Sequence, residues 1–238
     1  MDTAKDLSVD STTMVSKEKT YAFFDVDDTL IAVKSMFSFQ DYWYSKYPDF
    51  KAQHAFDRDM NRRHEPNVSW EKLNALYYSH FSGRNVDALL ACGKAWFDEL
   101  ENVQENLFHA PIVNVLRQHQ AQGHEVVFVS GSFPAVLLPV AERLGVHTIL
   151  AINMDVKNGH YTGRILPPQT IGEGKAQAIR DYLLQVGGEA DNCYAYGDDI
   201  SDLPMLKSVG KPHVVSGGRG LEKVAKQECW PVLSPTVA

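Results

Sequence analysis

Two aspartates follow a short apolar run near the start of the chain. Residues 21–24 lead into Asp25, a second carboxylate comes at Asp27, and Thr29 completes the pattern. Carboxylates at positions i and i+2 just beyond a strand can share a metal ion while one acts as nucleophile and the other as acid and base. A turn with an Asx hydrogen bond and a helix cap uses the same residue types, so this motif alone does not establish chemistry.

Further polar residues follow apolar runs or glycine turns later in the chain. They are Ser130 and Gly131 after residues 125–129, Lys175 after the turn 172–174, and Asp198 and Asp202 after residues 193–196. A hydroxyl and free N–H groups at a helix start favour an anion, and a lysine adds positive charge. Each feature also has a structural explanation: a helix N-cap, a solvated lysine and an acidic turn.

The elements around these residues alternate between strand and helix. The apolar runs 21–24, 125–129, 148–152, 193–196 and 213–215 predict strands, and 111–122, 134–144 and 174–185 predict helices. This alternation predicts an α/β fold with a Rossmann-like parallel sheet flanked by helices and right-handed crossovers. Asn158-Gly159 between β-prone residues predicts a hairpin over 155–165.

In such a sheet the carboxyl ends of the strands lie along one edge, so the polar residues above are expected to meet there. Carboxylates without histidine or cysteine favour a hard cation, and Mg²⁺ is the usual choice beside a phosphate. Two acids, a metal, a hydroxyl and a lysine match a transferring phosphoryl group. The joint occurrence at strand and helix boundaries favours this interpretation over separate structural roles.

Residues 34–108 have a different character. They read as amphipathic helices without a strand signal, and they hold 15 of the chain's 25 aromatic residues. We therefore expect a helical cap inserted into the sheet domain, with a small core of its own. The predicted organisation is a disordered leader over 1–19, a catalytic core over 20–33 and 109–238, and the cap over 34–108.

Composition excludes several other classes of protein. The chain has 238 residues and a net charge of −7, which does not indicate a nucleic-acid or anionic-membrane surface. Its three cysteines are far apart and are expected to be reduced. No apolar run approaches the ~20 residues that span a bilayer, and the leader lacks the apolar core of a signal peptide. We expect a cytoplasmic protein, as a monomer or homodimer.

The four motifs resemble those of the haloacid-dehalogenase-like superfamily, in its phosphoserine-phosphatase-like branch (subfamily IB). The motifs are DVDDT at 25–29, SGS at 130–132, EGK at 173–175 and GDDISDLP at 197–204, and the resemblance covers residues 21–233. It implies a Rossmann-like core with a mobile helical cap inserted after the first motif.

The resemblance also implies residue roles. Asp25 would attack phosphorus and form an aspartyl-phosphate, and Asp27 would protonate the leaving oxygen and then activate water. Mg²⁺ would be held by the Asp25 carboxylate, the Asp27 carbonyl and Asp198, with Asp202 orienting these ligands or the lysine. Ser130, Gly131 and Lys175 would bind phosphoryl oxygens, and Thr29 would steady the loop. The acid at Asp27 favours a phosphatase over a dehalogenase.

Departures from the branch bear on the substrate. Lys34 stands where phosphoserine phosphatases have a glutamate that meets the substrate's amino group, so serine phosphate is not the expected substrate. The cluster of Arg58, Arg62 and Arg63 would suit a substrate carboxylate or second phosphate, or else forms a solvated helix face. Four cap rings either line a pocket or belong to the core: Trp43, Tyr44, Tyr77 and Tyr78.

The sequence thus predicts a Mg²⁺-dependent phosphatase acting on a small organic phosphate monoester. A phosphotransferase or phosphomutase would use the same aspartyl-phosphate intermediate. A binding or regulatory module without turnover is the alternative from another class of protein, and the intact set of motif residues argues against it.

Overall fold

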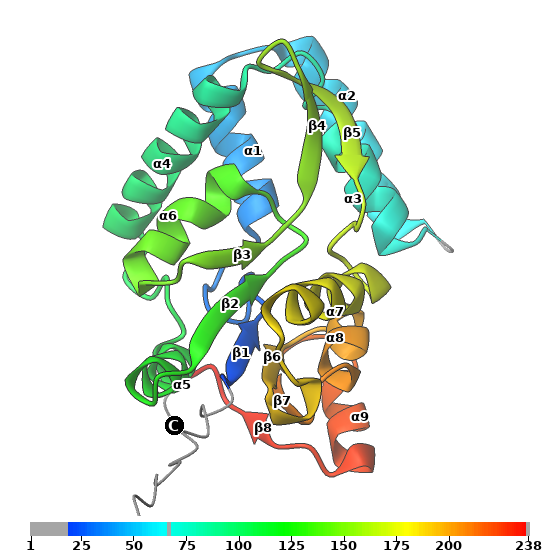
Figure 1. Cartoon of the computed structure of the whole chain (residues 1–238). Helices are drawn as coiled ribbons and strands as arrows, with labels where there is room; N and C mark the ends of the chain where they lie inside the picture. The colour runs from blue at the N-terminus through cyan, green and yellow to red at the C-terminus, as the bar shows by residue number, and fades with distance from the viewer. Residues whose placement is uncertain (1–18, 66–67, 237–238) are drawn as a thin grey trace, which may run out of the picture.

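The computed structural model describes residues 19–65 and 68–236. The predicted leader therefore lies almost wholly outside the described residues. Six parallel strands form the central sheet in the order β3-β2-β1-β6-β7-β8. Their bounds are β1 Tyr21–Phe24, β2 Glu125–Val129, β3 Thr148–Leu150, β6 Tyr194–Gly197, β7 Lys211–Val215 and β8 Val232–Leu233. The predicted α/β fold with a parallel sheet is confirmed (Figure 1).

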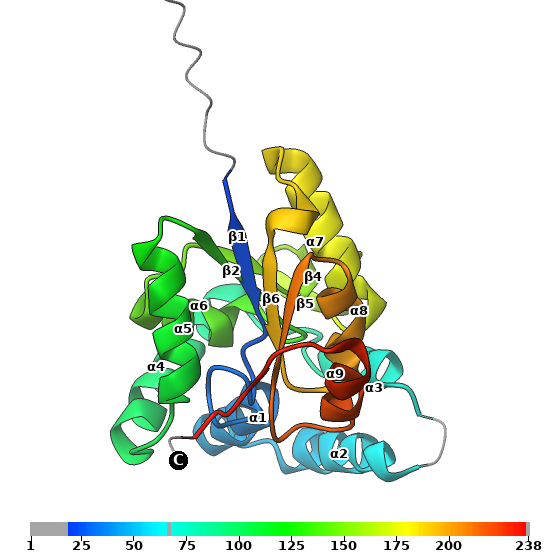
Figure 2. The same ribbon diagram turned by 90° about the horizontal axis from the view of Figure 1, so that it is seen from below.

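Helices cover both faces of the sheet, as the apolar strands require. Figure 2 shows the strands between α5 (Ala110–Ala121) on one side and α7 (Glu173–Val186), α8 (Leu203–Lys207) and α9 (Leu221–Glu228) on the other. Side chains of β1 alternate between the faces: Tyr21 and Phe23 join one buried cluster, and Ala22 and Phe24 the other. Each cluster is therefore closed by a different set of helices.

The structure departs from the predicted strands at the sheet edges. Strand β3 ends at Leu150 rather than at 152, because the N–H of Ile152 donates to the carbonyl of Ser132 and leaves the sheet. Strand β7 begins two residues earlier than predicted, at Lys211. The two-residue β8 and the five-residue α8 are too short to give a periodic signal.

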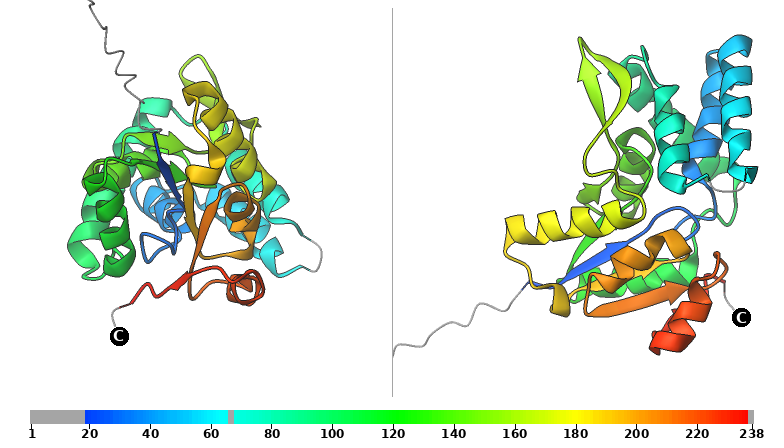
Figure 3. Two further views of the ribbon diagram at one scale, coloured as in Figure 1. Left: turned by 60° about the horizontal axis from the view of Figure 1, so that its bottom comes forward. Right: turned by 90° about the vertical axis from the view of Figure 1, so that its right-hand side faces the viewer.

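The described part of residues 34–108, called the cap segment below, is helical and contains no named strand. Its elements are α1 Ser35–Lys46, α2 Phe50–Met60, the 3-10 helix η1 Asn61–His64, α3 Trp70–Ser79 and α4 Val86–Val103. Side chains of Asp49, Ser69 and Asn85 cap the starts of α2, α3 and α4. In Figure 3 (right) these helices lie above the sheet.

The rings of the cap segment do not form a core of their own, which differs from the expectation. Phe39, Tyr78 and Phe81 pack around Phe133, at the start of α6 (Pro134–Leu144), with ring centroids 5.0–5.7 Å apart. Helix α4 also packs closely on α6, where a β-carbon at Gly93 would clash with the backbone of Ala135. The many aromatic residues of the cap segment predict that their rings are buried. They do not predict which element the rings pack against.

The predicted hairpin is confirmed, as β4 (Asn153–Lys157) and β5 (His160–Leu166), with Asn158 and Gly159 both at positive φ in its turn. The hairpin lies beside α3 (Figure 1), and Val86 donates a backbone hydrogen bond to the carbonyl of Gly159. This segment, predicted as part of the core, therefore packs on the cap segment. Among the described helices, none is long and apolar enough to cross a membrane.

Candidate active site

Three adjacent strands bring the predicted site residues together. Asp25 follows β1, Ser130 follows β2 and Asp198 follows β6, and β1 pairs with the other two strands in parallel register. All three residues therefore reach the same edge of the sheet. The loop after β1 is tight: Leu30 and Ile31 both donate to the carbonyl of Val26, which directs the loop back over the strand end.

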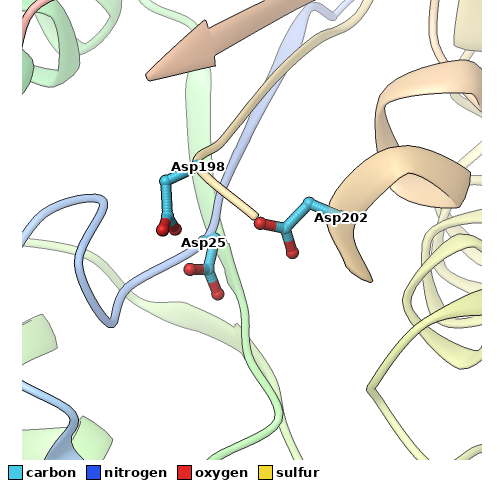
Figure 4. A group of neighbouring side chains, drawn as sticks. All are labelled: Asp25, Asp198 and Asp202. Carbon is cyan, nitrogen blue, oxygen red and sulfur yellow. The ribbon is translucent and has the colours of Figure 1, made fainter. Parts of the chain in front are cut away.

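Three buried carboxylates converge at this edge. Oxygens of Asp25, Asp198 and Asp202 lie within 4.8 Å of one another, and Figure 4 shows that they come from three separate points of the backbone. The Lys175 ammonium donates to Asp25 Oδ1 and to Asp202 Oδ1, each at 2.6 Å. Thr29 Oγ1 donates to Asp198 Oδ1 at 2.9 Å. The structure thus joins five of the predicted residues in one network.

The position of Lys175 depends on the glycine turn before it. Gly172 has a φ of 54°, and a β-carbon at Gly174 would clash with the backbone of Gln169. The close approach lets α7 begin next to the strand ends, and Lys175, its third residue, is 3% exposed. Burial lowers the pKa of Lys175, but Asp202 and Asp25 outweigh that effect and leave the pKa raised. The lysine stays charged.

One cation does not neutralise the three acids. Burial, followed by repulsion from Asp25 and Asp202, raises the pKa of Asp198 to about 7. Burial raises the pKa of Asp202 to about 6 despite its contact with Lys175. Both pKa values are raised first by burial and then by the neighbouring carboxylates, so the ionised forms of these acids are disfavoured where they lie.

Asp27 lies in a different setting from Asp25. Its Oδ2 accepts hydrogen bonds from the backbone N–H and the hydroxyl of Ser35, at 3.1 and 3.0 Å, while its Oδ1 is buried without a hydrogen-bond partner. Burial, with repulsion from Asp25, raises the pKa of Asp27 to about 7. A carboxyl with a pKa near neutrality can both give and take a proton. Ser35, at the start of α1, was not predicted from the sequence.

The loop after β2 is held from both sides. Ser130 Oγ accepts from the N–H of Ser132 at 3.0 Å, and the Ser130 carbonyl accepts from Thr170 at 2.7 Å. The Gly131 carbonyl accepts from Asn74 and Tyr78 of α3, at 2.9 and 3.0 Å. Sequence analysis missed Thr170 and Asn74 and singled out Tyr78 only as a ring, because contacts to backbone carbonyls leave no motif.

A cavity of about 590 Å³ opens over these residues. Seven of the eight predicted site residues line it: Asp25, Asp27, Ser130, Gly131, Lys175, Asp198 and Asp202. Thr29 is fully buried behind the cavity wall and acts on Asp198. The predicted residues therefore share one cavity, with the carboxylates and the lysine at the strand ends.

A family model of haloacid dehalogenase-like hydrolases matches residues 22–207 of the chain. The chain belongs to this family. It is 34% identical over 234 residues to a probable phosphatase of Mycobacterium tuberculosis, covering 92% of this chain and 76% of that protein. A phosphoserine phosphatase of Mycobacterium tuberculosis is 26% identical over 223 residues, covering 89% of this chain and 69% of that protein.

Two solved structures share the fold. A protein of unknown function from Bordetella pertussis superposes with a TM-score of 0.81 at 23% identity, covering 92% of this hydrolase and all of that chain. A phosphoserine phosphatase determined with an analogue of its phospho-aspartyl intermediate superposes with a TM-score of 0.63 at 16% identity, covering 92% and 95% of the two chains. At these identities the likeness concerns the fold.

The cavity of this hydrolase is acidic. Its lining includes six aspartates against Lys34, Lys175 and Arg219, so the acidic residues outnumber these bases by three. A phosphate ester is itself an anion and would add to the imbalance. Oxygen donors with excess negative charge fit a hard divalent cation. Both oxygens of Asp202 accept hydrogen bonds, from Lys175 and from the N–H of Asp199, and both oxygens of Asp25 accept as well, from Lys175 and Thr29. Asp198 accepts from Thr29 at Oδ1, which leaves its Oδ2 the most available of these oxygens.

The basic residues singled out in the cap segment lie in different places. Lys34 lines the cavity and pairs with Asp28 at 2.8 Å. Arg58, Arg62 and Arg63 are exposed and do not line it. The guanidinium of Arg63 lies over the ring of Phe37, 5.6 Å from its centroid, at the edge of the cavity wall.

The four singled-out rings also divide. Tyr77 lines the cavity, whereas Tyr44 and Tyr78 are buried without reaching it, and Trp43 packs partly buried beneath the guanidinium of Arg84. Both interpretations of the cap rings therefore apply, to different residues.

Asp199, the neighbour of Asp198, has a structural role. Its carboxylate caps the 3-10 helix η3 (Ile200–Asp202) and accepts two hydrogen bonds from Arg219, at 2.8 and 3.0 Å. The Arg219 guanidinium lies 4.3 Å from the ring centroid of Trp70, the first residue of α3. This contact joins the sheet side of the cavity to the cap segment.

Proposed function

We propose that this hydrolase is a Mg²⁺-dependent phosphatase that forms an aspartyl-phosphate on Asp25. One observation carries the proposal: within a single cavity Asp25 lies against Lys175 and Asp198, while Asp27 presents a carboxyl oxygen without a partner. Two neighbouring carboxyls in different environments can differ in protonation, so that one acts as the nucleophile and the other as the general acid and base. The phosphatase-named relative supports the same reaction class.

In the proposed reaction, a carboxylate oxygen of Asp25 attacks phosphorus and the bond from phosphorus to the ester oxygen breaks. The leaving oxygen takes a proton from Asp27, so the alcohol departs neutral. Asp27 then takes a proton from a water molecule that attacks the acyl phosphate, which releases inorganic phosphate and restores both carboxyls. Ser35 holds Asp27 in place through two hydrogen bonds during both transfers.

The phosphoryl oxygens would lie against Lys175 and the loop at Ser130 and Gly131. Thr170 and Ser132 hold that loop, so its N–H groups are fixed before the substrate arrives. Mg²⁺ would be held by Asp25, the Asp27 carbonyl and Asp198, and it would supply positive charge next to the phosphoryl group. Asp202 would orient Lys175, to which it is bonded at 2.6 Å.

Replacing Asp25 by asparagine tests the proposal. Asp25→Asn keeps the shape of the side chain but removes the nucleophile, so turnover of p-nitrophenyl phosphate with Mg²⁺ should fall by at least about 10³-fold, the scale lost when a nucleophile is removed. Asp57→Asn, an exposed residue of α2 outside the cavity, is the matched control and should keep full activity.

Retained activity in Asp25→Asn, with folding unchanged by circular dichroism, would overturn the nucleophile assignment. Chelation followed by added Mg²⁺ should abolish and restore wild-type turnover, and activity without any divalent cation would contradict the metal requirement. Equal yields of alcohol and inorganic phosphate identify hydrolysis. A phosphate deficit on addition of an acceptor alcohol would identify a phosphotransferase instead.

A further inference from the structure

The cavity has one wall that takes no part in the proposed chemistry. It is formed by the cap segment, and its side chains are apolar or aromatic: Met36, Phe37, Met60, Trp70, Leu73 and Tyr77. They come from α1, α2 and α3, so three helices contribute to one continuous surface facing the strand ends. The leaving group of a phosphate held at Asp25 would point toward this wall.

The polar groups of the same wall are already engaged. Asn74 donates to the Gly131 carbonyl at 2.9 Å and accepts from Gln169 at 2.9 Å. The hydroxyl of Tyr77 donates to the Met36 carbonyl at 2.7 Å. Lys34 is paired with Asp28. The amino and carboxylate groups of a small zwitterion would therefore lose water here without gaining a matched partner.

The far edge of the wall is held in place by Arg219. Its guanidinium lies over the Trp70 ring, and its charge is taken up by two hydrogen bonds to Asp199. The Trp70 ring is therefore held in place on one face, and Arg219 is not a free cation for an anionic substrate.

From this wall we propose that the leaving group is an alcohol bearing an aromatic ring, which rests on the proposed phosphatase function. Three aromatic rings and two methionine thioethers line this part of the cavity. Aromatic rings and thioethers both make favourable contacts with an aromatic ligand. A cavity of about 590 Å³ has the size of sites that enclose a ring-bearing small molecule. The cap wall is thus the specificity determinant, and Phe37 and Trp70 are its principal contacts.

Esters of primary alcohols test the proposal because they share one type of leaving group. Ethyl phosphate, 2-phenylethyl phosphate and O-phosphoserine would be compared by kcat/KM. We expect 2-phenylethyl phosphate to exceed each of the others by at least about 10-fold, the scale of pocket discrimination between apolar groups. Phosphoserine equal to or better than 2-phenylethyl phosphate would overturn this inference. Absence of turnover for every ester, p-nitrophenyl phosphate included, would refute the phosphatase function instead.

A variant pair locates the effect at the wall. Phe37→Ala should lower kcat/KM for 2-phenylethyl phosphate about 10-fold more than it lowers kcat/KM for ethyl phosphate. Phe50→Ala is the matched control, since Phe50 lies on the same segment, is 75% exposed and does not line the cavity. Trp70→Ala repeats the test from another helix if Phe37→Ala folds poorly. Equal losses for both esters would overturn the assignment of the wall to specificity.

Discussion

The two sides of the cavity are built from opposite kinds of side chain. On the sheet side, ionised residues meet within hydrogen-bonding distance, as Lys175 does with Asp25 and Asp202. On the cap side, the surface is apolar, and the polar atoms of Asn74 and Tyr77 are bonded to other groups of the protein. The sheet side can therefore move charge and protons, and the cap side, apart from Lys34 in its pair with Asp28, selects by shape and apolar contact.

This difference separates reaction from recognition. Groups that attack or protonate must be held rigidly, and the ends of neighbouring parallel strands do so through the backbone. The cap helices close over the site by side-chain packing, and their contact residues can vary without moving Asp25. A site divided in this way allows one chemistry to act on different alcohols.

The largest expected effect comes from removing the cation of the sheet side. Lys175→Met leaves Asp25 and Asp202 buried without their shared partner, which should lower the free energy of unfolding by about 3–5 kcal/mol. Chemical denaturation with chelator present measures it. Lys94→Met is the control, because Lys94 makes only an exposed helix pair with Asp98. A loss in Lys175→Met no larger than in this control would show that the sheet side is not held together by charge.

A smaller effect is expected where the cap segment packs on α6. Gly93→Ala places a methyl group against the Ala135 backbone and should cost about 1–3 kcal/mol, although alanine is the better helix former. Ala95→Gly, an exposed position of the same helix, is the reverse control and should cost about 1 kcal/mol through propensity alone. If Gly93→Ala stabilises the protein, α4 and α6 are not in close contact.

The smallest effect concerns the cap-side hydrogen bonds to the loop after β2. Tyr78→Phe removes one of two donors to the Gly131 carbonyl and should cost about 1 kcal/mol in unfolding free energy. Tyr47→Phe, on an exposed ring, should cost nothing measurable. A loss above about 3 kcal/mol in Tyr78→Phe would mean that Asn74 does not satisfy the carbonyl alone, and that the two sides are more tightly coupled than their chemistry indicates.

The sheet side was predictable from the sequence because its residues lie at strand and helix boundaries. Apolar runs locate β1, β2 and β6, and the residue that follows each observed strand is an aspartate or a serine that reaches the edge of the sheet. Topology then brings Asp25, Ser130 and Asp198 together without knowledge of side-chain positions. Seven predicted residues line the cavity for this reason.

The cap side was much less predictable. Aromatic density in residues 34–108 indicates burial, but which rings face the cavity depends on how three helices cross. Tyr77 and Tyr78 are neighbours in sequence, yet only the first lines the cavity. Ser35 and Thr170 each act through one or two hydrogen bonds. Such contacts require no fixed spacing between residues, so they leave no pattern in the sequence. The division of the chain into core and cap at residues 34 and 109 stays a prediction.

Trapping the covalent intermediate tests the central claim most directly. The wild-type hydrolase would be mixed with p-nitrophenyl phosphate and Mg²⁺, quenched within a turnover, and treated with borohydride, which reduces an aspartyl-phosphate to homoserine. Peptide mass spectrometry should then find homoserine at position 25, and none in a sample without substrate. Steady turnover with an unmodified Asp25, or with the modification at another aspartate, would contradict the account.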